Sequence, residues 1–193
     1  LALVDKGYEV IIPTPYWVTY SELVKLAEGN VVEIRSKLEH GFKISPLELE
    51  QAITPKTKAF LFSSPCNPSG AVYTKEELAN LADVFRRHPD IAIISDEIYE
   101  YINFGGTHQS IAQFEDLKER IIIVNGLSKA FAMTGWRLGY IAANVEIAKA
   151  TEKIQGQFTS GTNSIAQRSA ITALTADLSP SFEMVKQFAE RRK

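Results

Sequence analysis

The sequence predicts an α/β protein whose mostly parallel sheet is sandwiched by helices. Short apolar runs rich in β-branched residues alternate with longer stretches of helical period, which is the order of successive β-α-β units. Most of the short runs are apolar on both faces, as in strands that helices cover on each side. No internal repeat, low-complexity tract or flexible linker divides the 193 residues. We therefore expect one domain over residues 1–193.

The short apolar runs predict six strands. They are expected at residues 9–13, 31–35, 58–63, 91–95, 120–125 and 138–143.

The stretches of helical period predict helices at residues 17–28, 45–53, 74–87, 145–158 and 163–177, and a last helix that runs to the C-terminus. Ser45 and Pro46 open the second of these helices. Thr74, followed three residues later by Glu77, forms a capping box at the start of the third. The chain begins at Leu1 in a segment that we expect to be helical, which suggests a fragment of a longer protein.

The composition argues against several classes of partner. Lys and Arg number 21 and Asp and Glu 23, so the net charge of −2 lacks the positive excess that nucleic acids attract. No apolar run reaches the ~18 residues of a membrane span, and the N-terminus lacks the order of a signal peptide. We expect a soluble, cytoplasmic protein that binds neither nucleic acid nor membranes.

Cysteine and histidine predict neither a disulfide framework nor a metal site. Cys66 is the single cysteine, which excludes an intrachain disulfide and fits a reducing compartment. His40, His88 and His108 share no zinc-binding spacing with it. We therefore expect no metal.

Polar or aromatic residues follow four of the predicted strands, at the strand ends where open α/β sheets bind their ligands. They are Trp17 after the first strand, Asn67 after the third, Asp96 and Tyr99 after the fourth, and Lys129 after the fifth. Each alone has an ordinary structural explanation, as a turn residue, a helix cap, a packing aromatic or a solvated charge. No structural explanation accounts for all of them at one edge of one sheet.

Pyridoxal 5′-phosphate is a ligand that needs this combination of side chains. Its aldehyde forms a Schiff base with a lysine, and a carboxylate keeps its ring nitrogen protonated. Its 3′-oxygen takes hydrogen bonds, its ring stacks, and its phosphate needs a cation such as Arg137, eight residues after Lys129. A buried carboxylate at Asp96 would stabilise the charged ring, which draws off the electron pair left when the substrate loses its Cα proton.

The segment Gly126–Gly139, GLSKAFAMTGWRLG, resembles the pyridoxal-phosphate attachment motif of class I aminotransferases, in which a lysine and an arginine stand eight residues apart. The motifs PYW at 15–17, NPSG at 67–70 and SDEIYEY at 95–101 occur in the order of that family. The resemblance therefore runs through essentially the whole chain, and it is strongest to the bacterial aspartate and prephenate aminotransferases. It implies the large, pyridoxal-phosphate-binding domain of a fold-type I transferase.

The resemblance implies a role for each matching residue. Lys129 would bind the cofactor covalently and move the proton between the substrate Cα and the cofactor C4′, and Asp96 would pair with the ring nitrogen. Asn67 and Tyr99 would bind the 3′-oxygen. The remaining matches are Trp17 stacked on the ring, Arg137 on the phosphate, and Ser160 as a phosphate contact that crosses the subunit interface.

This family implies an aminotransferase with ping-pong kinetics. It would move an amino group between an L-amino acid, aspartate or a related dicarboxylic or aromatic acid, and a 2-oxo acid such as 2-oxoglutarate. A homodimer is implied by analogy with the family. Carbon-sulfur lyases, aminocyclopropane-carboxylate synthases and the sensor domains of some transcription regulators use the same constellation and stay open as alternatives. A nucleotide-binding module has little support, because Gly105 and Gly106 lack the G-x-G-x-x-G spacing after a strand.

Some positions depart from the family's pattern. Gly126 stands where some members have a serine that binds the phosphate, and the stretch 154–160, IQGQFTS, lacks an arginine that some aspartate aminotransferases present to their substrate. Substrate choice therefore stays open. Members of the family are about twice as long, so we expect residues 1–193 to lack an N-terminal arm and a C-terminal small domain. We do not expect residues 1–193 alone to catalyse transamination.

Overall fold

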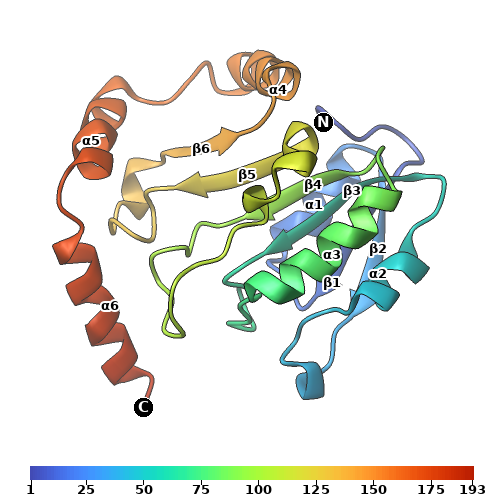
Figure 1. Ribbon diagram of the computed structural model, residues 1–193. Coiled ribbons are helices and arrows are strands. Elements are labelled where there is room, and N and C mark those ends of the chain that lie inside the picture. Colours follow the sequence, from blue (N-terminus) through green and yellow to red (C-terminus); the bar gives the residue numbers. More distant parts are fainter.

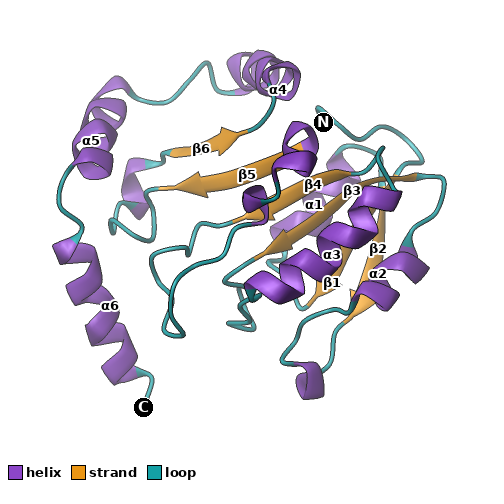
Figure 2. Ribbon diagram, viewed as in Figure 1, coloured by secondary structure: helices purple, strands orange, loops and turns teal.

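A six-stranded sheet runs through the centre of the computed structural model, which describes residues 1–193 (Figures 1 and 2). Its strands are β1 Glu9–Thr14, β2 Asn30–Arg35, β3 Thr57–Ser63, β4 Ala92–Asp96, β5 Ile121–Gly126 and β6 Gly139–Ala142. The spatial order is β2-β1-β3-β4-β5-β6. The first five strands pair in parallel, and β6 pairs antiparallel with β5. The predicted mostly parallel sheet is confirmed.

Six α-helices and four short 3-10 helices connect and cover the strands. The α-helices are α1 Thr19–Leu26, α2 Pro46–Ala52, α3 Lys75–Arg87, α4 Val145–Phe158, α5 Ser164–Thr175 and α6 Ser179–Arg191. The 3-10 helices span Leu38–His40, Ile111–Gln113, Glu115–Arg120 and Thr134–Trp136. Figure 1 shows α5 and α6 beyond the β6 edge, away from the other strands. None of the helices has the length and apolar character needed to cross a membrane.

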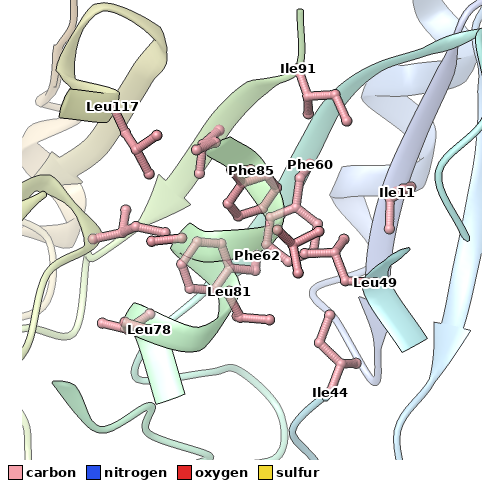
Figure 3. Packing of buried hydrophobic residues seen from close by; sticks show 14 of the residues in the cluster. Ile11, Ile44, Leu49, Phe60, Phe62, Leu78, Leu81, Phe85, Ile91 and Leu117 are labelled. Carbon is pink, nitrogen blue, oxygen red and sulfur yellow. The ribbon is translucent and has the colours of Figure 1, made fainter. Parts of the chain in front are cut away.

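Helices cover both faces of the sheet because side chains alternate along each strand. Phe60 and Phe62 of β3 belong to one buried cluster with residues of α2 and α3 (Figure 3). Ala59 and Leu61, their neighbours on β3, belong to a second cluster with residues of α1. Phe60 and Phe85 of α3 are both fully buried, with ring centroids 5.3 Å apart. This alternation explains why β3 is apolar throughout, as the sequence indicated.

Capping boxes start two of the helices. The Thr74 hydroxyl accepts from the backbone N–H of Glu77, and the Glu77 carboxylate accepts from the backbone N–H of Thr74. The predicted capping box is therefore confirmed. Ser45 and Glu48 make the same pair of bonds at the start of α2. The hydrogen bonds from Ser45 lower the pKa of Glu48 below its ordinary value.

The expectation that Leu1 lies in a helix was wrong, because residues 1–8 form no helix. The chain instead turns at Gly7, which has a φ of 84°, and the N–H of Tyr8 donates to the carbonyl of Asp5 at 3.1 Å. The apolar side chains of Leu3 and Val4 pack against the second cluster instead.

Thr74→Ala should lower the free energy of unfolding by about 1 kcal/mol, because an N-terminal backbone N–H of α3 loses its acceptor. Thr74→Ser keeps the hydroxyl and should stay within a few tenths of a kcal/mol of the wild type. Urea denaturation of the three proteins gives the comparison. Equal stability of the alanine and serine variants would contradict the contribution assigned to this cap.

Candidate functional site

Adjacent parallel strands bring five predicted site residues to one edge of the sheet. β1, β3, β4 and β5 are neighbours in this order and run in the same direction, so their carboxyl ends lie side by side. Just beyond or at these ends stand Trp17 after β1, Asn67 after β3, Asp96 and Tyr99 on and after β4, and Lys129 after β5. Asp96 is in register with Val124, five positions before Lys129.

Asp96 is the partly buried last residue of β4, and two donors hold its carboxylate. The hydroxyl of Tyr20 donates to Oδ2 at 2.6 Å, and the backbone N–H of Ile98 donates to Oδ1 at 3.1 Å. Burial raises the pKa of Asp96 above its ordinary value, and these two hydrogen bonds oppose that rise. Burial and the nearby Asp96 raise the pKa of Tyr20 far above the phenol's ordinary value, so its hydroxyl stays protonated and acts as a donor.

Tyr20 also contacts Trp17, the aromatic residue that is predicted to stack on a ligand ring. This residue of α1 is only 5% exposed, and its ring meets the ring of Trp17 edge to face with centroids 5.8 Å apart. The indole of Trp17 is 47% exposed and therefore accessible to a ligand. A single buried phenol thus contacts both a carboxylate and an aromatic ring of the site.

Lys129 and Tyr99 approach each other across the turns that follow β5 and β4. The Lys129 Nζ lies 5.6 Å from the centroid of the Tyr99 ring, a geometry that suits a cation–π contact. Both side chains are partly buried. Leu127, two residues before Lys129, and Ala130, directly after it, are buried, and the N–H of Ala132 donates to the Lys129 carbonyl at 3.2 Å. The turn therefore holds the lysine at the sheet edge.

Two hollows open at this edge. One, of about 670 Å³, is lined by Asn67, Tyr99, the segment 102–105 and Arg192. The other, of about 400 Å³, is mostly apolar and contains Trp17 and Asp96 in its lining. Volumes of this order suit a small molecule. Four of the predicted residues are thus divided between two hollows, Asn67 and Tyr99 in the first and Trp17 and Asp96 in the second, and Lys129 lines neither.

Arg137 and Ser160 are not among the residues that line these two hollows. Arg137 is exposed, adopts a left-handed backbone with a φ of 53°, and donates to the carbonyl of Thr134 at 2.9 Å. It lines a third hollow, of about 780 Å³, with Thr159 and Gly161, the two neighbours of Ser160. Ser160 itself is exposed. Neither Arg137 nor Ser160 makes a hydrogen bond to the residues at the ends of β3 and β4.

Close packing of β5 against β6 explains the glycine at position 126. A Cβ on Gly126 would lie 3.0 Å from the backbone of both Leu138 and Gly139. Contacts this short need the backbone to shift, so a serine side chain does not fit here without moving β6.

A second buried carboxylate, which was not predicted from the sequence, lies beside Asp96. Glu97 is only 3% exposed, and its side chain accepts hydrogen bonds from Ser95 and Ser110 and pairs with His108. Ligand atoms of Glu97, Glu100 and His108 lie within 4.8 Å of one another. The direct contact of 2.7 Å between Glu97 Oε2 and His108 Nε2 leaves no space for an ion between those atoms.

The chain is similar over its whole length to known aminotransferases. The model of the family "Aminotransferase class I and II" matches residues 1–193. The aspartate/prephenate aminotransferase of Nitrosomonas europaea is 49% identical over 195 residues, which cover 100% of this chain and 49% of that protein. The aspartate aminotransferase of Bacillus subtilis is 50% identical over 98% of this chain and 48% of that protein.

Solved structures show the same similarity in three dimensions. The aspartate aminotransferase of Rhizobium meliloti superposes with a TM-score of 0.97 at 42% identity, over 99% of this chain and 48% of that one. The aspartate aminotransferase of Thermus thermophilus with maleate gives 0.92 at 44% identity, over 99% and 50%. The fold is therefore that of fold-type I aminotransferases. The chain spans about half the length of these relatives.

Asp96→Asn should stabilise the protein without ligand, and more so at pH 7 than at pH 4. Because the folded pKa of Asp96 is raised, the folded state binds the proton more tightly than the unfolded state. Near the unfolded pKa the penalty is small, and it grows as pH rises through the folded pKa and the buried carboxyl ionises. The asparagine removes this penalty.

Urea denaturation of the wild type and Asp96→Asn at both pH values measures the effect. Asp90→Asn removes an exposed carboxylate and should change the free energy of unfolding by less than ~0.5 kcal/mol. A difference between wild type and Asp96→Asn that shrinks as the pH rises would contradict the buried, ionised state of Asp96.

Proposed function

Because the chain belongs to the aminotransferase class I and II family, we propose that the protein is an aminotransferase. It moves an amino group between an L-amino acid, aspartate or a related dicarboxylic or aromatic acid, and a 2-oxo acid such as 2-oxoglutarate. The names of the relatives from Nitrosomonas europaea and Bacillus subtilis support aspartate as a donor. The proposal depends above all on Lys129, which stands in the segment Gly126–Gly139 at the same sheet edge as Asp96.

The side chains at this edge fit pyridoxal 5′-phosphate, which we infer to be the cofactor. Asp96 and Trp17 share an apolar hollow, which suits a flat ring with a protonated nitrogen. Tyr99 and Asn67 share the adjacent polar hollow. When bound, the cofactor supplies an electron-withdrawing ring that makes the proton on the substrate Cα easier to remove.

Lys129 carries the covalent and proton-transfer chemistry of the proposal. Its Nζ would hold the cofactor through the aldehyde between turnovers, and the same atom would remove and return the proton at the substrate Cα. The contact with Tyr99 restricts where Nζ lies. Asp96 would hold a proton on the ring nitrogen, and the hydrogen bond that it accepts from Tyr20 orients its carboxylate.

The other matching residues bind and orient the cofactor. Tyr99 and Asn67 would hydrogen-bond to the 3′-oxygen, and the exposed indole of Trp17 would stack on the ring. Arg137 binds the phosphate as a cation. Ser160 contributes a phosphate contact to the partner subunit of a homodimer.

Exposed apolar side chains support an assembly larger than the 193 residues. Phe158, Ile165, Leu174 and Phe182 of α4, α5 and α6 are each at least half exposed. Apolar surface of this kind marks contact with another segment or subunit. We assign it to the remaining half of a full-length chain and to a second copy in a cytoplasmic homodimer. The relatives compared above are named as aminotransferases, so we do not extend the proposal to a lyase, a synthase or a transcription regulator.

Lys129→Ala in the full-length protein should reduce both half-reactions by at least ~10²-fold, because proton transfer at the substrate Cα loses its general base. Borohydride reduction should attach the cofactor covalently to the wild-type protein but not to Lys129→Ala, which has no amine at this position to form the imine. Single-turnover absorbance with aspartate and then with 2-oxoglutarate measures the two half-reactions.

Lys153→Ala, which removes an exposed lysine of α4, is the matched control and should keep wild-type rates. Near-normal transamination by Lys129→Ala would exclude this lysine from the mechanism.

A further inference from the structure

Behind the proposed cofactor carboxylate lies a buried polar network that the mechanism above does not use. The Glu97 carboxylate accepts from the hydroxyl of Ser95 at 2.9 Å and of Ser110 at 2.7 Å, both at Oε1. Its Oε2 lies 2.7 Å from Nε2 of His108. The side chains of Glu97 and His108 are only 4% and 13% exposed. Three donors thus converge on one buried acid.

Asp96 and Glu97 belong to opposite faces of the same strand end. Side chains alternate along β4, so Asp96 meets Tyr20 of α1, whereas Ser95 and Glu97 lie on the face that α3 covers. The backbone N–H of Glu97 also donates to the carbonyl of Val124 on β5 at 2.8 Å. Glu97 is therefore fixed by its backbone and by its side chain, directly next to Asp96.

The network also fixes the two segments that follow. The carbonyl of Glu97 accepts from the N–H of Glu100 at 2.9 Å, in the turn that carries Tyr99. Ser110, which donates to Glu97, caps the next 3-10 helix by accepting from the N–H of Ala112. Between these anchors runs the segment 102–105, which lines the same hollow as Tyr99.

This arrangement is a poor source of stability. A buried carboxylate costs several kcal/mol of desolvation, and apolar replacements of buried pairs are often neutral or stabilising. The Nδ1 atom of His108 is buried and has no hydrogen-bond partner among the protein atoms of the structure. The presence of a pair that lowers stability at this place is better explained by the positions in which it holds the neighbouring segments.

We propose that Glu97 and His108 are positioning residues, which hold the turn from Asp96 to Tyr99 in the geometry that binds pyridoxal phosphate. This inference rests on the proposed function. The pair contacts no substrate and acts through Asp96 and Tyr99, whose carboxylate and phenol it keeps in place.

The paired variant Glu97→Met/His108→Leu in the full-length protein separates positioning from stability. The free energy of unfolding of its cofactor-free form should change little, because removal of the buried charge offsets the acceptor that the hydroxyls of Ser95 and Ser110 lose. Its dissociation constant for pyridoxal phosphate, measured by equilibrium dialysis, should rise about 10-fold, as for other residues that orient a binding group. Unchanged cofactor affinity would overturn the proposal.

A second glutamate–histidine pair, with the same nitrogen-to-oxygen distance of 2.7 Å, provides a matched control. His88 Nε2 lies 2.7 Å from Glu50 Oε1, in a partly exposed position between α2 and the end of α3. Glu50→Met/His88→Leu should leave the cofactor dissociation constant within ~2-fold of the wild type. An equal loss of affinity in both pairs would overturn a specific role for Glu97 and His108.

Two further variants guard against misfolding and test the route of action. His108→Gln keeps a donor for Glu97 and should bind the cofactor nearly as tightly as the wild type. In an Asp96→Asn background the effect of the paired variant should shrink, because residues that act through one another are not additive. Full additivity, or a His108→Gln protein as weak as the paired variant, would contradict the proposal. A wild-type protein that binds no pyridoxal phosphate would instead refute the proposed function itself.

Discussion

The parallel pairing of β4 with β5 is the constraint on which the proposed site depends. It places the end of β4, with Asp96, beside the end of β5, which leads to the turn of Lys129. Thirty-three positions separate these residues in the sequence, yet neighbouring strands that run in one direction bring them to the same edge. A reversed or shifted β5 would move Lys129 to the opposite edge or turn Asp96 away, and the remaining side chains would have no common ligand to bind.

Much of this arrangement could be predicted because it follows from local patterns. Each predicted strand is present with its ends within one residue of those expected, since runs that are apolar on both faces have few alternatives to a covered strand. The capping box at Thr74 is visible in the sequence because both partners lie within one helical turn. The placement of Asp96 and Lys129 followed from one further rule, that parallel strands align their carboxyl ends.

The rest depends on contacts between residues far apart in the chain, which no short pattern reveals. The hydroxyl of Tyr20 donates to Asp96, which lies 76 positions later in the chain. The only sequence feature that points to Tyr20 as a site residue is its position three residues after Trp17, on the covered face of α1. In the sequence, Glu97 is only the acid that follows Asp96 in the segment SDEIYEY. No local pattern pairs it with His108. The buried carboxylates of Asp96 and Glu97 both lower the stability of the folded state, because burial disfavours a charged carboxylate. The site therefore holds charged side chains in fixed positions at one end of the sheet, at a cost in folding stability.

The most direct test of this account is the protonation state of the cofactor ring. The full-length protein would be loaded with pyridoxal phosphate labelled with ¹⁵N in the ring, and its ¹⁵N NMR shift recorded near neutral pH. A carboxylate held at Asp96 by Tyr20 predicts a protonated nitrogen in the wild type and an unprotonated one in Asp96→Asn. An unprotonated ring nitrogen in the wild type, or the same shift in both proteins, would contradict the pairing of Asp96 and Lys129 in one site.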